Sequence, residues 1–250
     1  MKRYSAFFSV FATALFLALS LDAQAQDTVG VATNASGEKY LVDSKGMSLY
    51  YYTKDKTGDS DCNGNCLKVW PAFYVPTVSV SPSLDAADFG TITRADGAKQ
   101  TTYMGWPLYY WVRDKQPGDI TGEGVGKVWY ILKVPAYTVM ISTDAKLGNY
   151  LVDGKGMTLY WFTKDSPATS DGSGAANANW PAFAPDSFVV PSALDAADFK
   201  MIARGDGTRQ ATYKGYPLYY FVKDQMRGDV AGQGVKDVWY VIDPAKFPAE

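Results

Sequence analysis

The sequence feature that most constrains the fold is a six-residue motif that occurs four times. Each copy reads Tyr, two further aromatic residues, Thr or Val, a basic residue and Asp, directly after a Leu. Aromatic and β-branched side chains fit a pleated, half-buried surface, and both faces of every copy are apolar. Each copy therefore predicts a central strand covered on two sides. The motif positions that we single out are Tyr50, Tyr52, Asp55, Tyr109, Trp111, Asp114, Tyr160, Phe162, Asp165, Tyr219, Phe221 and Asp224.

The Asp that closes each copy has two interpretations. Its carboxylate can accept hydrogen bonds from turn N–H groups or from a Tyr hydroxyl, which makes the motif a structural corner. Alternatively, the Tyr and Asp side chains of a copy face a ligand. Recurrence of all four Asp in one frame after an apolar strand favours symmetry-related corners over a single active site.

Comparison of the chain with itself gives two periods. Tyr40 recurs as Tyr150 at a long offset that stays constant along the chain, and a shorter offset relates Tyr50 to Tyr109 within the first long repeat. The chain is therefore two long repeats, each made of two half-repeats, and such regular duplication predicts a repeat architecture.

We expect an all-β fold with two tandem domains of about 110 residues, at 26–134 and 138–250. Each domain contains two pseudo-symmetric half-repeats, and each half-repeat is a three-stranded β-meander, a polar loop and a short strand led by Trp. A single four-bladed β-propeller is the alternative, because four such units could form its blades.

The first 25 residues have the pattern of a secretory signal peptide. The basic pair Lys2-Arg3 precedes an apolar run at 6–21, and Ala-Gln-Ala at 23–25 is a small-x-small cleavage site. We expect residues 1–25 to be removed, so that the mature chain begins at Gln26. No cysteine lies at the cleavage site, and no later apolar stretch approaches the roughly 18–20 residues that span a bilayer. The sequence predicts a protein exported to the periplasm or outside the cell, without a lipid anchor.

Composition excludes several function classes. The chain has no histidine, which excludes His-based acid–base catalysis, Ser-His and Cys-His nucleophile pairs and His-ligated metal or haem sites. Its net charge is −2 and no basic cluster is present, so nucleic acid is not expected as a partner.

The only cysteines are Cys62 and Cys66, and an exported compartment favours their oxidation to a disulfide. The three residues between them allow this bridge if the loop is tightly turned. A redox-active pair is the alternative, although no thioredoxin-like pattern surrounds it.

Asp59, Asp61 and Asn63 place oxygen ligands at alternate positions before a Gly, as at the start of a calcium loop. The closing acidic ligand is missing, because the twelfth residue of that count is Trp70. Asp and Asn are also ordinary turn residues, so calcium remains an alternative here and no other cofactor is expected.

Large aromatic residues outside the motif divide into two groups. Trp106 and Tyr216 stand at turns before Pro, which makes them candidates for binding at the surface. Four Trp residues stand at repeat-equivalent positions beside Val or Pro, where packing in the core is the expected role: Trp70, Trp129, Trp180 and Trp239.

The motif resembles that of a bacterial family catalogued as a secreted repeat of unknown function, often found in lipoproteins and described by Tyr-x-aromatic-x-x-Asp. The loop from Cys62 to Trp70-Pro71, the Asp96-Gly97 hairpin and Gly105-Trp106-Pro107-Leu108-Tyr109 also match it. The resemblance covers roughly 29–242 as two copies and implies family membership without an activity.

The chain departs from this family in two ways. It lacks the lipid-bearing cysteine, so the lipoprotein location does not carry over. Its second copy has Gly172 and Ala176 in place of the two cysteines, so the bridge is not essential to the unit.

Two function classes remain open. The first is an exported, non-enzymatic repeat protein that binds an envelope protein or a surface ligand, favoured by tandem duplication and by the lack of a catalytic constellation. The second is an extracytoplasmic redox or electron-transfer accessory protein that uses the Tyr and Trp clusters, a metal or the Cys pair. A glycoside hydrolase with paired carboxylates is a third, less supported possibility.

Overall fold

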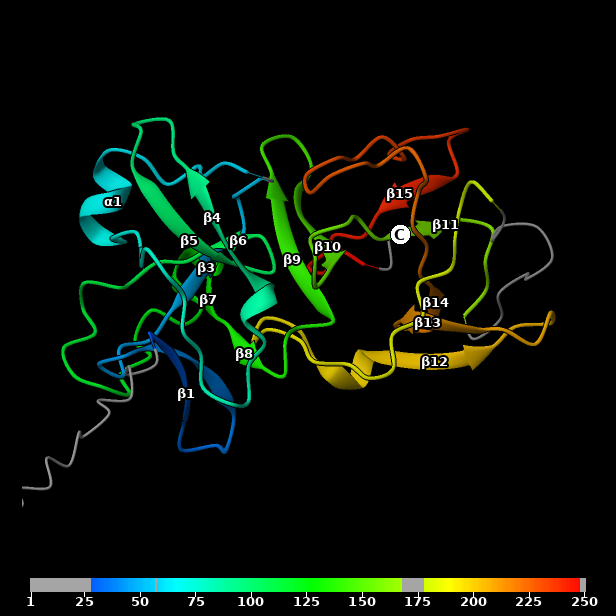
Figure 1. Cartoon of the computed structure of the whole chain (residues 1–250). Coiled ribbons are helices and arrows are strands. Elements are labelled where there is room, and N and C mark those ends of the chain that lie inside the picture. Colours follow the sequence, from blue (N-terminus) through cyan, green and yellow to red (C-terminus); the bar gives the residue numbers. More distant parts are fainter. Residues whose placement is uncertain (1–27, 57, 168–177, 248–250) are drawn as a thin grey trace, which may run out of the picture.

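The structure is a computed structural model of the chain and describes residues 28–56, 58–167 and 178–247. The predicted signal peptide lies outside the described residues. The described chain is mostly β, with several small antiparallel sheets and one short helix (Figure 1). Within the described ranges, no helix is long and apolar enough to cross a membrane.

The first sheet has the strand order β1-β2-β8. A hairpin joins β1 (Val29–Thr33) to β2 (Lys39–Asp43), as their apolar pattern predicts. Its turn forms because the Asn34 side chain accepts the backbone N–H of Glu38 at 2.9 Å. From the far end of the same long repeat, β8 (Lys133–Val134) pairs with the other edge of β2 and completes the sheet.

The residues just before β3 (Tyr50–Tyr52) pair with β2, through an antiparallel bridge between Val42 and Ser48 and a 3.0 Å hydrogen bond from the Leu49 N–H to the Leu41 carbonyl. The strand β3 continues from these residues and pairs with β7 (Trp129–Ile131) on one side, while Tyr50 forms an antiparallel bridge to Tyr109 on the other. The first half-repeat therefore starts as the predicted meander, and β3 extends beyond it to pair with the second half-repeat. The prediction of a central strand is confirmed for this copy, since Tyr50 and Tyr51 are fully buried.

The second half-repeat forms the same meander, with strand order β4-β5-β6. Its strands are β4 (Phe89–Thr93), β5 (Lys99–Tyr103) and β6 (Trp106–Pro107). The motif copy that follows is not a full strand, because Tyr109 makes only isolated bridges. The helical elements of the first long repeat are short: α1 (Asn65–Val69) and the 3-10 turns η1 (Ala86–Asp88) and η2 (Val125–Lys127).

The second long repeat reproduces this plan. β9 pairs with β10, β11 with β15, and β12-β13-β14 is the second meander. The bounds of these elements are β9 (Val139–Asp144), β10 (Gly148–Asp153), β11 (Tyr160–Phe162), η3 (Ala196–Asp198), β12 (Phe199–Ala203), β13 (Arg209–Tyr213), β14 (Tyr216–Pro217) and β15 (Trp239–Val241).

The half-repeats interlock within each long repeat. The pairs β3–β7 and β11–β15 each take one strand from either half. The described sheets have two or three strands, whereas a propeller blade typically has four. The half-repeat is therefore not a separate blade of the kind that the propeller alternative requires.

Contacts cross the predicted boundary between the two long repeats. One hydrophobic cluster combines Leu49, Tyr51 and Trp106 of the first repeat with Met140 and Val152 of the second. Figure 1 shows the source of these contacts, because β9 and β10 lie between the first repeat and the other strands of the second. The two long repeats thus share part of their core.

Trp106 is not the surface residue that the sequence predicts, since its side chain is fully buried. The second repeat covers it: the guanidinium of Arg227 lies 3.7 Å from the centre of the Trp106 ring. Arg227 also donates hydrogen bonds to the carbonyl oxygens of Gly105 at 2.7 Å and Met104 at 2.9 Å. One buried cation therefore joins the two repeats through a ring and a turn.

We expect Arg227→Ala to lower the free energy of unfolding by on the order of 2–4 kcal/mol. The change removes charge-assisted hydrogen bonds to the Gly105 and Met104 carbonyls and a desolvated cation–π contact to the buried Trp106 ring. Urea denaturation measures the loss. Arg209→Ala, at an exposed position of the same repeat, is the control and should stay within about 0.5 kcal/mol of the parent. Equal stability of the two variants would contradict this account of the junction.

Candidate functional site

The four motif copies meet in pairs through Tyr–Asp hydrogen bonds. The Tyr50 hydroxyl donates to Asp114 Oδ2 at 2.7 Å, and the Tyr109 hydroxyl donates to Asp55 Oδ2 at 2.8 Å. In each pair, the Tyr hydroxyl of one motif copy therefore donates to the Asp carboxylate of the other copy, in the other half-repeat. The second long repeat has the same exchange at 2.7 Å in both pairs, Tyr160 with Asp224 and Tyr219 with Asp165.

Backbone pairing explains this exchange. The N–H of Tyr50 donates to the Tyr109 carbonyl and the N–H of Tyr109 donates to the Tyr50 carbonyl, both at 2.9 Å. The two copies therefore run antiparallel with their Tyr residues opposite each other. In this register each Tyr side chain extends toward the end of the other copy, where the Asp stands.

In three of the copies, the second oxygen of the carboxylate binds the loop that follows the motif. Asp114 Oδ1 accepts from the N–H and the hydroxyl of Thr121 at 2.9 and 2.7 Å. Asp55 Oδ1 accepts from the N–H of Asp61 at 2.9 Å. Asp224 accepts from the N–H of Ala231 at the same distance. A carboxylate in these copies thus joins a strand from the other half-repeat to its own loop.

Burial sets the protonation of these pairs. Desolvation, with the Asp114 carboxylate beside it, raises the pKa of Tyr50 well above its ordinary value, so the hydroxyl stays a donor. Desolvation also raises the pKa of Asp55 to about 8, although the bonds from Tyr109 and Asp61 oppose the shift. The Asp224 pKa is raised for the same reason. These are groups enclosed by protein rather than carboxylates offered to solvent.

A stack of aromatic rings lies beside each set of pairs. Trp70 of the first half-repeat and Trp129 of the second lie face to face, with ring centres 3.9 Å apart. Tyr52 stacks on Trp129 and Trp111 on Trp70, each at 4.1 Å, so four rings follow one another. The second repeat has the same order, with Trp180 and Trp239 at 3.7 Å between Phe221 and Phe162. The prediction that these four Trp belong to the core is confirmed.

Glycine is required where the polar loop crosses this stack. A Cβ on Gly122 would lie 2.8 Å from the Trp70 ring and 2.9 Å from the Tyr50 ring. The missing side chain lets the Gly122 N–H reach the Tyr50 hydroxyl at 3.3 Å. Gly232 has the same role against Tyr160 in the second repeat.

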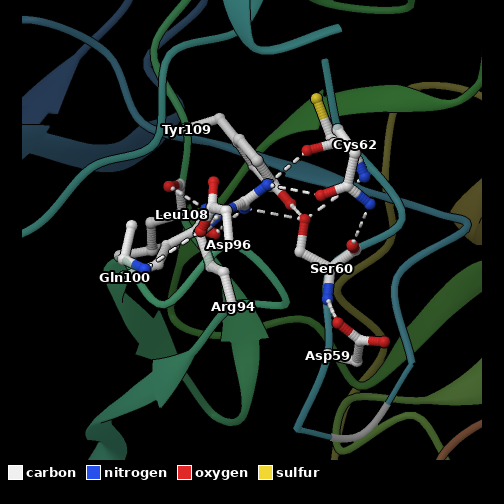
Figure 2. Close-up of polar contacts among 10 residues, drawn as sticks. Asp59, Ser60, Cys62, Arg94, Asp96, Gln100, Leu108 and Tyr109 are labelled. Carbon is white, nitrogen blue, oxygen red and sulfur yellow. Dashed lines mark hydrogen bonds and ion pairs between the residues drawn. The ribbon is translucent and has the colours of Figure 1, made fainter.

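A buried Arg network, which the sequence analysis missed, extends the first set of pairs (Figure 2). Arg94 is 3% exposed, and its guanidinium donates to Ser60 Oγ at 2.9 Å, Asn63 Oδ1 at 3.1 Å and the Cys62 carbonyl. Ser60 Oγ in turn contacts the Tyr109 hydroxyl. The network therefore links the Cys62 loop to the Tyr109–Asp55 pair.

The duplication of the sequence could have predicted this network, because its Arg and Gln residues occur in both long repeats. Arg94 and Gln100 recur as Arg204 and Gln210 at the long offset, and in both repeats the guanidinium bonds the Gln side chain. A charged residue that keeps its place in a duplicated hairpin indicates a structural partner. Ser60 is 2% exposed, so this hydroxyl is enclosed rather than available to a substrate.

The sulfur atoms of Cys62 and Cys66 lie 2.02 Å apart, which is disulfide distance. Of the proposed calcium ligands, Asn63 offers its oxygen to the Arg94 guanidinium, and Asp59 accepts the N–H of Ser60 at 2.7 Å. Among the described residues, no group of three or more His, Cys, Asp and Glu is placed to hold a metal ion.

We expect Tyr50→Phe and Asp114→Ala each to lower the free energy of unfolding by on the order of 1–3 kcal/mol, because each leaves a buried partner without its hydrogen bond. The double variant should lose less than the sum of the two, by about 0.5–3 kcal/mol. Urea denaturation of the four proteins measures this coupling, and Tyr160→Phe with Asp224→Ala repeats it in the second copy. Variants of full stability that lose a ligand would instead assign the motif to binding.

Four segments of the chain match a family described as a secreted repeat of unknown function: residues 30–73, 90–133, 142–184 and 200–243. Each segment contains one motif copy and one of the four repeat-equivalent Trp residues (Trp70, Trp129, Trp180 and Trp239), so the family's unit is the half-repeat rather than the long repeat. No curated protein and no solved structure was found to match the chain. Since the four segments cover more than half of its length, the chain belongs to this family of secreted repeats.

Proposed function

We propose that the chain is an exported, non-enzymatic binding protein of the cell envelope or exterior, without a lipid anchor, whose ligand lies in a groove between the two long repeats. The observation that carries the proposal is a groove of about 950 Å³ between β8 and the segment 188–196. Its lining comes from both long repeats, and a ligand site at such a junction is common.

The lining combines apolar and charged groups. Val134, Pro135 and Val190 offer apolar surface, while Lys39 and the ion pair of Lys133 with Glu38 stand at the edge. Hydrogen bonding to Lys133 lowers the pKa of Glu38, so its carboxylate stays charged. A peptide segment with apolar and polar side chains matches this lining.

Burial of the repeated residues supports binding over catalysis. The Tyr–Asp pairs and the stacked Trp residues are enclosed and bonded to one another. The residues that are repeated four times are thus used within the fold. The groove residues are not repeated, because Ser79 and Ser81 stand in the first long repeat where the second has Val189 and Pro191.

We expect Ala193→Trp to abolish capture of the native partner from envelope extract without lowering the melting temperature. Ala193 is exposed and lines the groove, so a large side chain there fills it without disturbing the core. Ser83→Trp is the matched control, because Ser83 is exposed and occupies the equivalent position in the first repeat. Mass spectrometry identifies what is captured. A partner retained by the Ala193 variant would sink the proposal.

A second candidate, a one-electron relay, is favoured by the four-ring stack. Oxidation of Tyr50 would release one electron and move its hydroxyl proton to Asp114, 2.7 Å away, and Trp70 lies 5.4 Å from the Tyr50 ring. Photo-oxidation by a ruthenium complex with persulfate as electron acceptor tests the idea. The relay requires that a tyrosyl or tryptophanyl radical form in the parent protein and that its lifetime be shorter in the Trp70→Phe variant. Identical radical decay in the two proteins would refute the relay.

A further inference from the structure

The two long repeats have an equivalent face. On the first repeat this face is covered by the second repeat, whereas on the second repeat it is more exposed to solvent. We call the face of the first repeat the junction face: Tyr51, Thr53, Trp106 and Tyr130. The terminal face is its copy in the second repeat: Trp161, Thr163, Tyr216 and Tyr240.

The junction face is covered by the β9–β10 hairpin and by Arg227 of the second repeat. The Thr143 N–H donates to the Thr53 carbonyl at 2.8 Å, and the hydroxyls of the two Thr residues are 2.7 Å apart. Met140 and Tyr137 pack into the same cluster as Tyr51. The Trp106 indole N–H donates to the Gly154 carbonyl at 3.3 Å. One hairpin thus supplies both apolar side chains and strand hydrogen bonds.

Burial differs sharply between the two faces. Tyr51, Thr53 and Trp106 are 0% exposed. Their copies are more accessible, since Trp161 and Tyr216 are only half-buried and Thr163 is exposed. The same residue types at the same strand positions are therefore left without the cover that the first repeat has.

Within residues 28–56, 58–167 and 178–247, one part of that cover is reproduced on the terminal face. Phe247, the copy of Tyr137, packs edge-on against Trp161 at 5.1 Å and Tyr216 at 5.3 Å. Beside it lies an apolar pocket of about 430 Å³. The pocket lining includes Leu147, Trp161, Thr163, Tyr240, Val241 and Phe247.

We propose that the terminal face binds in trans the first hairpin of another secreted repeat of this family. The hairpin would place a bulky apolar side chain against Trp161 and Tyr240, as Met140 does on the junction face, while Phe247 already fills the place of Tyr137. One of its strands would donate an N–H to the Thr163 carbonyl, as Thr143 does to Thr53. Addition of a strand in this way gives affinity through the backbone and specificity through alternate side chains.

The chain's own first hairpin does not have this chemistry. At the positions of Met140 and Arg227, the first repeat has Gly30 and Pro117. The first repeat therefore lacks both the apolar side chain and the cation that cover the junction face. The occupant is therefore a hairpin like that of the second repeat, carried by a different chain, rather than the first repeat of a second copy.

The residues of this face differ from those that line the groove proposed as the ligand site. Its test is therefore independent of the test of that function. The probe is a cyclised synthetic peptide with the sequence of residues 137–153, labelled with a fluorophore and titrated with the full chain. Because the junction face is already covered from within, only the terminal face is free to bind it.

We expect saturable binding of one peptide per chain, followed by fluorescence anisotropy. The matched control peptide, residues 27–43, occupies the same place in the first repeat and should bind at least about tenfold more weakly, a difference of about 1.4 kcal/mol. Tyr240→Lys should weaken binding by a similar factor. Leu147→Arg, a change at a half-buried turn residue that lines the pocket, keeps the test valid if the first variant does not fold. Val222→Lys, at a side chain that is 42% exposed, should bind normally.

Three outcomes would overturn the proposal. They are equal binding of the two peptides, binding that both face variants retain, and no binding at all. Concentration-dependent dimerisation of the parent chain that Tyr240→Lys abolishes would assign the face to a second copy instead.

Discussion

The reciprocal Tyr–Asp hydrogen bonds are the interaction on which each long repeat depends. Tyr50 reaches Asp114 and Tyr109 reaches Asp55, so neither half-repeat can satisfy its own buried carboxylate. A buried polar group left without its partner costs about 1–3 kcal/mol, and more when it is charged. The half-repeat is therefore the unit of sequence duplication, whereas the pair of half-repeats is the smallest unit that satisfies its buried hydrogen bonds.

The aromatic stack acts in the same direction. Trp70 and Trp129 come from different halves, and their contact across the repeat excludes water from the Tyr–Asp pairs beside them. Aromatic pairs contribute about 0.5–1.5 kcal/mol beyond their buried area, and exclusion of water strengthens the adjacent hydrogen bonds. The loop that closes over the stack needs Gly122, because a side chain there would enter the rings. The motif strands, the stacked Trp rings and the loop at Gly122 therefore form only in combination.

Local patterns predicted local structure well. The Asp96-Gly97 turn located the β4–β5 hairpin, and recurrence of Trp70 located the core. Pairing between half-repeats was beyond such reasoning, because an apolar strand such as β3 can join any neighbour and the choice depends on tertiary contacts. The exposed position predicted for Trp106 failed for the same reason: its cover, Arg227, comes from the other long repeat. The Tyr and Asp of the motif were identified, but their exchange between copies requires the register that only the structure gives.

Differences between the copies carry the information that the shared motif lacks. The motif builds the same interior four times, so it cannot by itself distinguish one surface from another. Arg227 replaces Pro117 and Met140 replaces Gly30, and both changes lie at the junction, where the second repeat must cover the first. The two long repeats thus share one interior but differ at the surfaces where they meet: the second repeat has the residues that cover a neighbour, and the first repeat has the face that they cover.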